Sequence, residues 1–589
     1  MDTTTKRLED FKSPRQLDGL DARALTDLAG EIRTFLLDNI SRTGGHIGAN
    51  LGTVELAIAL HAVYHSPEEP IIWDTGHQGY AHKLLTGRAH LFPTLNTYGG
   101  MNRFVTPRES EHDILEASHA GTSISIALGL ALARRMRGEG RPVVAVIGDS
   151  ALAEGMALEA FNHAVVEDVP LTIVVNDNGY AISPGFGGLH EALQDPGGRG
   201  GKLFRAWGAE VIGPVDGHDI EALMEAFQSA RQSGGVKVVH VKTVKGKGWA
   251  PADAHPLRMH FSFPFDKETG KSTLPPPPQT YQDVVAEVVM AEMETDPSIA
   301  CITPSTLYAT GLTPIFQKYP DRCFDPGMEE QHALTMAVGM ALAGAKPVVA
   351  YQSTFLQRAF DQMFHDVCFM ARPMLILGYR SGFAGYDNPT HHGVYDFSYL
   401  RGLPNLRILY PKDRHEARRM ARDALRALDG PVLILMPYGP VDDFDPSVME
   451  ETPERFAEPQ MVQTGREVMI VAVGHKFAAA RDAVARLREA DIDAGLVNLR
   501  YLKPLNVVFL ERLLSNARRV VTVEEFVRDG GVGGALMELA GDRGLGCQIL
   551  RLALPTAFIE PGSNAELERA YGLDAEGIVR AVRERWDEL

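Results

Sequence analysis

The sequence has few cysteines and no excess of positive charge. Its four cysteines lie far apart and form no Cys-x-x-Cys pair. This argues against a disulfide framework and a cysteine zinc site, and it makes a reducing cytoplasm the expected compartment. The formal net charge of −18 at pH 7 argues against a nucleic-acid partner, which needs a basic surface. It does not exclude small anionic substrates, since a basic pocket can lie in an acidic protein.

Long apolar segments are also missing. No stretch approaches the roughly 18 apolar residues of a membrane span. The polar start of the chain, Met1 to Lys12, lacks the apolar core of a signal peptide. We therefore expect a cytoplasmic protein without membrane association.

The remaining composition is that of an ordinary globular protein. With 589 residues, 45% hydrophobic and 23% charged, the chain is expected to form two to four domains. Short β-branched runs alternate with longer amphipathic segments, which predicts α/β domains with mostly parallel sheets. The clearest predicted strands are Val143–Ile147, Leu171–Val175, Val236–Val241, Pro347–Tyr351, Met374–Leu377, Val432–Leu435, Val468–Val473 and Val520–Val523.

Two segments interrupt this alternation. Leu274 is followed by four prolines, which neither a helix nor a central strand accommodates. Between about Gly439 and Gln463, Pro, Asp and Glu replace the periodic pattern. These breaks predict three α/β domains, at residues 1–274, 279–440 and 460–589. Gly185–Gly201 is rich in glycine and is interpreted as a mobile surface loop.

Two polar clusters follow neighbouring predicted strands of the first domain. Gly148-Asp149-Ser150 ends one strand, a helix is expected over about Leu152–Glu167, and the next strand ends in Asn176-Asp177-Asn178. In such a β-α-β unit both clusters lie at the carboxyl ends of parallel strands, where α/β sheets bind ligands. Asp149 and Asn178 offer the oxygen ligands that Mg²⁺ prefers beside a diphosphate.

The same residues are common in turns after strands, so each cluster alone indicates little. Their spacing of 29 residues within one β-α-β unit favours the metal site.

Three histidine-bearing segments precede this unit, around His46, His77 and His119. A histidine in a glycine-rich turn is more often structural, but three in one domain indicate a lined pocket. The segment Ser118-His119-Ala120-Gly121-Thr122-Ser123 is expected to open a helix whose amide N–H groups could receive phosphate. Lys245-Gly-Lys-Gly-Trp249, with His260 beyond it, adds positive charge and an aromatic side chain, although it could equally be a solvated turn.

The second domain offers a carboxylate and an aromatic ring. Glu329 and Glu330 precede a helix rich in small residues. Glu329 is interpreted as favouring the helix dipole, and Glu330 as the better candidate for a cofactor contact. Phe355 follows a strand and could stack on a flat heterocycle, although most such side chains only fill the core.

Taken in order, these motifs resemble the 1-deoxy-D-xylulose-5-phosphate synthase family of the transketolase-like superfamily. The resemblance covers nearly the whole chain. It is strongest in Gly52-Thr-Val-Glu-Leu56, Gly76-His-Gln78, Gly213-Pro-Val-Asp-Gly-His218, Glu330-Gln-His332, Ser353-Thr-Phe-Leu-Gln-Arg358 and Tyr501-Leu-Lys-Pro-Leu505.

The resemblance implies thiamine diphosphate and Mg²⁺ as cofactors, with roles for particular residues. The implied metal ligands are Asp149, Asn178 and the carbonyl of Tyr180. The residues implied around the diphosphate and thiazolium side are His77, Ser118, His119, Ala120, Ser150, Ala151, Asn178, Lys245 and Trp249. Phe355 would stack on the aminopyrimidine, and Glu330 would hydrogen-bond its ring nitrogen.

The implied reaction joins pyruvate to an aldehyde. The Glu330 contact would help the thiazolium carbon lose its proton and attack the ketone of pyruvate, and the ring would accept electrons as CO2 leaves. The acceptor would be glyceraldehyde 3-phosphate. The candidates for proton transfer and substrate binding are His46, His260, His391 and Asp387. The resemblance also implies a homodimer, with a diphosphate-binding domain at 1–274, a pyrimidine-binding domain at 279–440 and a transketolase-like C-terminal domain at 460–589.

Several departures from the family pattern lie on the substrate side. Ser150 replaces the second glycine of Gly-Asp-Gly, and several tens of residues are missing after Asn178. Gln352 stands where a tyrosine is usual, and Tyr438 stands where an arginine would bind the acceptor's phosphate. Arg380 is kept. Losing one of two charged partners typically weakens a phosphate contact about 10²-fold.

Alternative functions therefore stay open. One is a paralogue with the same pyruvate chemistry and a different aldehyde acceptor, phosphorylated or unphosphorylated. Others are a transketolase, a 2-oxoacid dehydrogenase component, or a protein that binds thiamine diphosphate without turnover.

Overall fold

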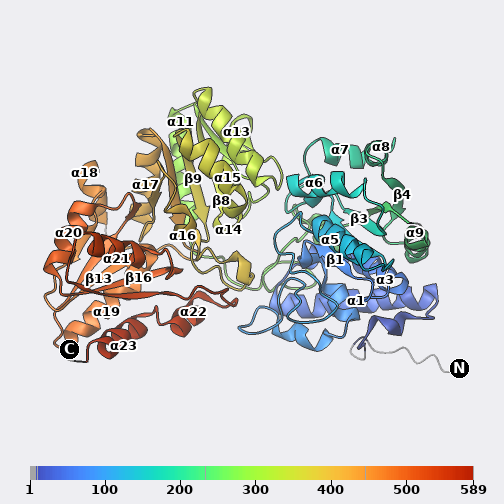
Figure 1. The fold of residues 1–589 in the computed structure, drawn as a ribbon, viewed down its shortest axis with the longest axis horizontal. Helices are drawn as coiled ribbons and strands as arrows, with labels where there is room; N and C mark the ends of the chain where they lie inside the picture. Colours follow the sequence, from blue (N-terminus) through green and yellow to red (C-terminus); the bar gives the residue numbers. More distant parts are fainter. Residues whose placement is uncertain (1–7, 9–10, 233, 445, 588–589) are drawn as a thin grey trace. The chain divides into compact units, whose positions relative to one another are not determined.

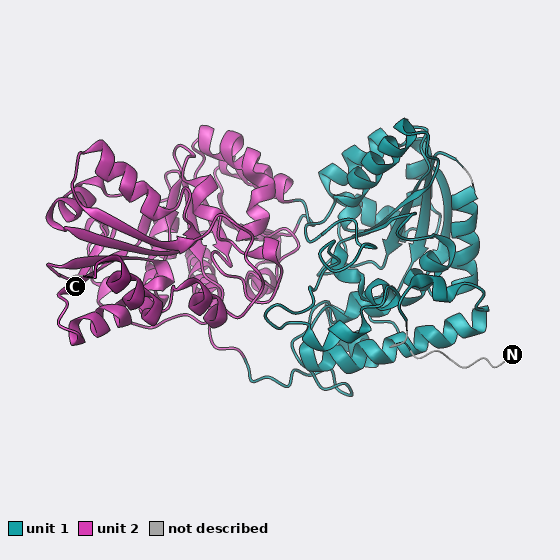
Figure 2. Cartoon of the chain, turned by 60° about the horizontal axis from the view of Figure 1, so that its bottom comes forward, with its two compact units in different colours: residues 1–276, 326–329 teal, residues 277–325, 330–589 magenta. Residues whose placement is uncertain are grey.

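The computed structural model describes residues 8, 11–232, 234–444 and 446–587. Its contacts divide the chain into two compact units, coloured teal and magenta in Figure 2. Unit 1 holds residues 1–276 and 326–329, and unit 2 holds residues 277–325 and 330–589. Most of Met1–Lys12, on which the prediction of no signal peptide rests, lies outside the described residues.

Unit 1 is built on one parallel sheet of five strands in the order β1-β2-β3-β5-β4. The strands are β1 Ile71–Asp74, β2 Val143–Gly148, β3 Leu171–Asp177, β4 Glu210–Asp216 and β5 Val236–Lys242. The central strands are rich in valine and isoleucine and are buried on both faces, as expected for a parallel sheet covered by helices.

The helices of unit 1 form two hydrophobic clusters around this sheet. The longer helices are α1 Ala22–Thr43, α3 Val54–Val63, α5 Ser123–Met136, α6 Gly155–Ala164 and α9 Ile220–Gln232. The shorter ones are α2 Ile47–Gly52, α4 Tyr80–Leu85, α7 Gly188–Gln194, α8 Arg199–Ala206 and α10 Ala250–Ala254. The first cluster contains residues of α1, α3 and α9, and the second contains residues of α5 and α6.

Unit 2 contains two sheets. The first has seven strands in the order β15-β10-β11-β9-β8-β6-β7, parallel except for β15. Its strands are β6 Ile299–Ile302, β7 Cys323–Phe324, β8 Lys346–Gln352, β9 Met374–Tyr379, β10 Arg407–Leu409, β11 Pro431–Met436 and β15 Tyr501–Lys503. The helices before and among them are α11 Tyr281–Thr295, α12 Thr313–Lys318, α13 Glu330–Leu342, α14 Ser353–Leu356, α15 Phe360–Gln362, α16 Asp396–Leu400 and α17 Arg414–Arg426.

The second sheet of unit 2 has the order β12-β14-β13-β16-β17, with β12 antiparallel. Its strands are β12 Gln460–Gln463, β13 Val468–Val473, β14 Ala494–Leu499, β16 Arg519–Val527 and β17 Gln548–Leu554. Helices cover both faces, α20 and α21 on one and α19 and α23 on the other (Figure 1). The helices are α18 Pro453–Phe456, α19 Phe477–Glu489, α20 Val507–Asn516, α21 Val532–Asp542, α22 Asn564–Tyr571 and α23 Ala575–Arg585.

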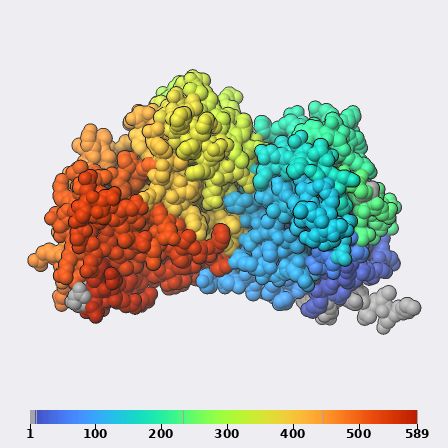
Figure 3. Space-filling view, viewed as in Figure 1, coloured from blue at the N-terminus to red at the C-terminus, as the bar shows by residue number. Residues whose placement is uncertain are grey.

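The two sheets of unit 2 share one hydrophobic core. One buried cluster contains side chains of β8 and β9 together with side chains of β13, β14 and β16. In the space-filling view, the yellow and the orange to red parts of this unit form one continuous surface (Figure 3). Strand β15 adds to this link, because it follows the second sheet's β14 in the chain but pairs with β10 of the first.

The predicted fold class is confirmed, since all three sheets are mostly parallel and flanked by helices. Each of the eight predicted strands is observed. The domain boundaries stay a prediction: each predicted range contains one sheet, with β15 as the exception. One local prediction was wrong, because Gly185–Gly201 contains α7 and the start of α8. Glycine content suggested a loop there, but Leu193 and Phe204 anchor the two short helices in the core.

No helix among the described residues is both long enough and apolar enough to cross a membrane.

Candidate active site

The tips of β2 and β3 bring the two predicted metal ligands to the same edge of the unit 1 sheet. Gly148 pairs with Asn176 across the strands, so Asp149 and Asn178 both follow at the carboxyl ends. Asp149 is 3% exposed, and its Oδ2 accepts the N–H of Gly179 at 3.1 Å. Among the described residues, its Oδ1 has no hydrogen-bond partner. A buried carboxylate oxygen without a donor is suited to a cation.

Burial raises the pKa of Asp149, which means that a nearby positive charge would stabilise its ionised form. Asn178 is less buried, and its Oδ1 accepts the N–H of Tyr180 at 3.0 Å. The space beside Gly148 is open, since a Cβ there would have no heavy atom within 4 Å. The residues at this edge therefore fit a divalent cation with a ligand approaching along the backbone.

His190 lies beside this corner and was missed from the sequence. Its Nδ1 is 3.9 Å from Oδ2 of Asp149, and this contact raises the pKa of His190. The residue belongs to α7, in the segment interpreted as a loop, so nothing in the sequence pattern connects it to Asp149.

Asp177, between Asn176 and Asn178, belongs to a different network. Its carboxylate contacts the Nε2 of His240 and accepts from Lys242, both at 2.7 Å. These partners hold the pKa of Asp177 below its ordinary value although burial would raise it. The neighbouring Asp177 is therefore structural, as the simpler interpretation of this segment proposed.

The turn around His77 is held by Asn50, another residue that the sequence did not identify. The Nδ2 of Asn50 donates to the carbonyl oxygens of His46 at 2.6 Å and of His77 at 2.7 Å. Its Oδ1 accepts the N–H of Tyr80 at 2.7 Å. One buried amide thus fixes the two histidine-bearing segments relative to each other.

Three of the predicted histidines meet. The ring centroids of His46 and His77 are 4.9 Å apart, those of His77 and His260 are 5.1 Å apart, and those of His46 and His260 are 5.4 Å apart. Burial, together with the positive charge of Lys245, holds the pKa of His260 well below its ordinary value. At neutral pH, His260 is therefore a neutral imidazole that can accept a proton.

Lys245 is buried and points its Nζ at the carbonyl of Ala181, 2.7 Å away. Burial lowers its pKa to about 7, and Asp149 opposes that shift. A binding anion would stabilise its charged form.

Two motifs of the family resemblance hold the strand end before Lys245. The Nε2 of His218 accepts the N–H of Val244 at 2.9 Å. Its Nδ1 therefore carries the proton and donates to Oε2 of Glu55 at 3.0 Å. His218 and Arg33 hold the pKa of Glu55 at about 2, although burial alone would raise it.

The segment Ser118-His119-Ala120 lies near the turn of His77, because the carbonyl of Ala117 accepts the N–H of Gly76 at 2.7 Å. The segment leads into a helix as predicted, since α5 begins at Ser123. The carboxylate of Asp74 accepts the N–H groups of Gly121 and Ser123. Those two amides are therefore not available to a phosphate.

Two other predicted contacts lie in the core. Trp249 is 6% exposed and donates its Nε1–H to the carbonyl of Lys267 at 2.8 Å. Ala151 belongs to the cluster around α5 and α6, next to Ser150 at the end of β2. Trp249 packs on Phe265, with ring centroids 5.0 Å apart, so its observed contacts are structural.

Unit 2 carries the second group of predicted residues. Glu330 is buried at the first position of α13. Its carbonyl accepts from the hydroxyl of Tyr351 at 3.1 Å, and its Oε2 is 3.9 Å from the Nε of Arg358. Glu330 was expected to precede the helix, but it is its first residue.

Phe355 and His391 lie together. Their rings meet edge to face, with centroids 5.4 Å apart. The hydroxyl of Thr354 donates to the carbonyl of Thr390 at 2.6 Å, which ties α14 to the segment that carries His391. The adjacent His392 points elsewhere, because its Nδ1 accepts the N–H of Ala384.

The residues predicted on the substrate side also include a close group. The Nη1 of Arg380 donates to Oδ2 of Asp387 at 2.6 Å, and the guanidinium carbon lies 4.7 Å from the ring centroid of Tyr438. Gln352 is buried at the end of β8, paired with Tyr379 of β9, directly before Arg380.

Comparisons with known proteins agree with this arrangement along the chain. A family model described as 1-deoxy-D-xylulose-5-phosphate synthase matches residues 8–197 and 196–243. Models described as transketolase, pyrimidine binding domain, and transketolase, C-terminal domain, match residues 278–441 and 458–578.

Curated relatives match over nearly their full length. The 1-deoxy-D-xylulose-5-phosphate synthase 1 of Geobacter sulfurreducens is 40% identical over 625 residues, covering 98% of this chain and 96% of the relative. The 1-deoxy-D-xylulose-5-phosphate synthase of Syntrophotalea carbinolica is 40% identical, covering 98% and 97%. That of Dechloromonas aromatica is 38% identical, covering 99% of both chains.

Proposed function

The chain belongs to the 1-deoxy-D-xylulose-5-phosphate synthase family, and from this premise we propose that it condenses pyruvate with glyceraldehyde 3-phosphate, giving 1-deoxy-D-xylulose 5-phosphate and CO2. It is then a thiamine-diphosphate-dependent transferase. The observation that carries the proposal is the identity of about 40% to relatives of this name over nearly the whole chain. Thiamine diphosphate, when bound, supplies the carbon nucleophile and accepts the electrons released as CO2 leaves.

Mg²⁺ is proposed at the tips of β2 and β3. Asp149, Asn178 and the carbonyl of Tyr180 would hold it. The Oδ1 of Asp149 is buried and accepts no hydrogen bond from the described residues, which supports a cation there. Lys245 would neutralise diphosphate charge, which fits a lysine whose pKa burial has lowered to about 7. His77, Ser118, His119, Ala120, Ser150 and Ala151 are proposed around the same group. Trp249 would support it only indirectly, because its ring lies in the core.

Glu330 would donate or accept a proton at the pyrimidine ring nitrogen, with Phe355 stacked on that ring. Glu330 is the first residue of α13, and its Oε2 lies 3.9 Å from the Nε of Arg358. Both features hold the carboxyl in one position. A buried carboxyl is suited to this task, since a general acid or base must be fixed within hydrogen-bonding reach.

The histidines would handle the substrate's protons. His260 is held neutral beside His46 and His77. It would accept a proton only transiently, because its lowered pKa favours passing the proton on. His391 meets Phe355 in unit 2, and it is proposed with Asp387 to bind and protonate substrate oxygens.

On the acceptor side, Arg380 would bind the phosphate. The alternative of an unphosphorylated acceptor is not favoured, because the relatives that cover nearly the whole chain are named for the phosphorylated product.

The test is product analysis. The purified protein, incubated with pyruvate, glyceraldehyde 3-phosphate, thiamine diphosphate and Mg²⁺, is expected to release CO2 and form a pentulose phosphate, identified by mass spectrometry. A Glu330→Gln variant is the matched control and should form almost none. Absence of the pentulose phosphate with the unmodified chain would refute the proposal.

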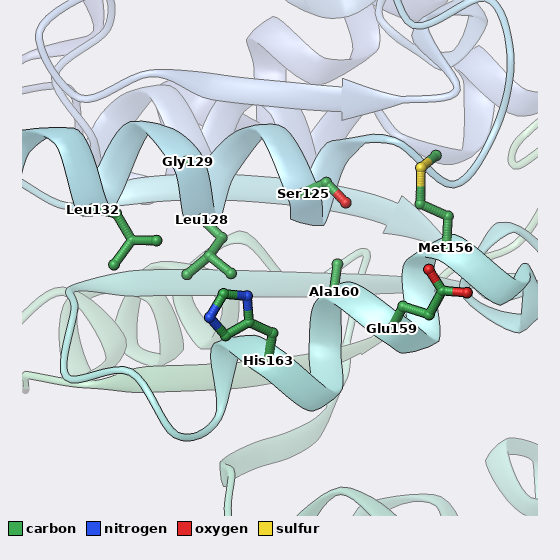
Figure 4. A pocket seen from close by; sticks show the side chains of 8 residues that line it. All are labelled: Ser125, Leu128, Gly129, Leu132, Met156, Glu159, Ala160 and His163. Carbon is green, nitrogen blue, oxygen red and sulfur yellow. The ribbon is translucent and has the colours of Figure 1, made fainter.

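We also propose that the protein forms a homodimer in the cytoplasm. A groove of about 370 Å³ runs between α5 and α6 (Figure 4) and is lined mainly by small or apolar side chains, among them Leu128, Leu132 and Met156. Met136, at the end of α5, is 87% exposed. Such exposed apolar faces commonly mark protein interfaces. Sedimentation velocity should give twice the chain mass, and Met156→Glu should shift it towards the monomer; a monomeric unmodified chain would contradict the dimer.

A further inference from the structure

The ring of Tyr438 forms a platform for the side chain of Arg380. The guanidinium carbon lies 4.7 Å from the ring centroid, within the range of a favourable cation–π contact. On its other edge, Arg380 donates Nη1 to Asp387 at 2.6 Å. Two groups of opposite kind, an aromatic face and a carboxylate, thus determine where the guanidinium lies.

The platform is itself fixed by the surrounding chain. A Cβ at Gly385 would lie 2.8 Å from the Cε1 of Tyr438, so the backbone of the loop packs directly on the ring. The carbonyl of Tyr438 accepts from Nδ2 of Asn564 at 2.8 Å, and the N–H of Gly562 donates to the carbonyl of Gly385 at 3.3 Å. Gly562 and Asn564, at the start of α22, therefore hold both sides of this packing.

The contact leaves part of the guanidinium for a ligand. The side chain of Arg380 is 25% exposed, and within the described part of the chain its guanidinium group donates one hydrogen bond, from Nη1 to Asp387. The backbone of Arg380 has φ of 59°, a conformation that non-glycine residues rarely adopt, so the chain leaves the extended course of β9 at this residue. A five-donor cation on an aromatic face, with edges left open, is suited to bind a phosphate group in a defined orientation.

We propose that Tyr438 is a positioning residue for the acceptor: its ring holds Arg380 in the orientation that binds the phosphate of the aldehyde substrate. The proposal rests on the proposed function and deepens it. Tyr438 acts through Arg380, and its hydroxyl has no part in substrate binding. The aromatic face replaces a second cation as the means of making one arginine selective.

Two variants separate the ring from the hydroxyl. Tyr438→Phe keeps the aromatic face and removes the hydroxyl, whereas Tyr438→Leu keeps an apolar side chain and removes the face. Steady-state kinetics are measured with glyceraldehyde 3-phosphate, with unphosphorylated glyceraldehyde, and with varied pyruvate.

Tyr438→Leu is expected to raise KM for glyceraldehyde 3-phosphate by about 3- to 30-fold, the range of a cation–π contact. Its kcat, its KM for pyruvate and its kcat/KM for glyceraldehyde should change less than twofold. Tyr438→Phe should match the unmodified chain in all of these. A merely structural role would instead lower kcat or affect both aldehydes alike.

Three results would overturn the inference: an unchanged KM in Tyr438→Leu, an equal loss with both aldehydes, or a raised KM in Tyr438→Phe. The last result would assign the hydroxyl to the substrate. Because Tyr438→Phe preserves the packing, it keeps the inference open to refutation even where Tyr438→Leu does not fold. Failure of the proposed function is distinguishable, since the unmodified chain would then form no pentulose phosphate at all.

Discussion

The proposed metal corner of unit 1 and the Arg380 loop of unit 2 are built in opposite ways. Asp149 and Asn178 follow adjacent strands of one β-α-β unit, and the register of β2 with β3 is enough to bring them together. Arg380 and Asp387 lie on a segment between β9 and α16, and two of its anchors are residues more than 100 positions further along. Glu525 accepts the N–H of Phe383 at 3.1 Å, and Glu566 accepts from the hydroxyl of Tyr386 at 2.5 Å.

The difference teaches how easily the metal corner and the Arg380 loop can each change. A corner determined by a local fold unit changes only if the unit changes, since its ligands stand on strand ends. A loop held by distant side chains can shift when any one of those anchors is altered.

The largest expected effect breaks the metal corner. Asp149→Asn removes the buried charge, and we expect the affinity for thiamine diphosphate in the presence of Mg²⁺ to fall by at least about 100-fold. Isothermal titration calorimetry measures it. Asp177→Asn is the matched control, because Asp177 lies at the end of the neighbouring strand β3. It should alter stability while leaving cofactor affinity within a few fold. Equal loss in both variants would contradict the assignment.

Next comes the main anchor of the Arg380 loop. Glu525 is buried against Lys476 at 2.6 Å and His475 at 2.9 Å. Glu525→Gln leaves those charges without their buried partner, and we expect the free energy of unfolding to fall by about 3 kcal/mol. Glu568→Gln removes the other, 27% exposed partner of Lys476 and should cost about 1 kcal/mol or less. Urea unfolding of both variants measures the difference.

The same carboxylate gives a pH dependence with a definite sign. Burial would raise the pKa of Glu525, but His475 and Lys476 hold it well below its ordinary value of 4.5. Its stabilisation is therefore complete above pH 4.5 and is lost as the pH falls below that value. Between pH 6 and pH 3.5, the unmodified chain should lose more stability than Glu525→Gln. A constant difference between the two would contradict this.

How much the sequence could predict follows the same division. The spacing of Asp149 and Asn178 and the β-branched strands predicted the metal corner, because both are properties of short segments. Asn50, His190 and Glu525 could not be predicted, since their roles depend on which distant segments the fold brings together. Composition also misled locally: glycine content suggested a loop at 185–201, where two buried side chains stabilise short helices.

A smaller effect is expected from the pair of His218 and Glu55, which holds the strand end before Lys245. His218→Leu removes the acceptor of the Val244 N–H and the donor to Glu55. Val244 is exposed, but Glu55 is buried, and a buried group that loses a hydrogen-bond partner costs about 1–3 kcal/mol. Part of this cost should appear as a roughly tenfold weaker affinity for thiamine diphosphate. Calorimetry with Mg²⁺ present measures it. A variant that lost stability but bound the cofactor normally would show that His218 and Glu55 do not position Lys245.

The smallest effect sharpens the comparison most, because it tests a single bond across 180 positions of chain. Tyr386 donates to Glu566, which also accepts from the N–H and the hydroxyl of Ser563 at the start of α22. Tyr386→Phe should cost about 1 kcal/mol of stability and raise KM for glyceraldehyde 3-phosphate about two- to fivefold, since the loop keeps its other anchors. A double-mutant cycle with Glu566→Gln isolates the bond from the helix cap, and we expect a coupling of at least about 0.5 kcal/mol. Additive effects on KM would mean that α22 stabilises the fold without positioning the loop, and the contrast with the metal corner would then rest on Glu525 alone.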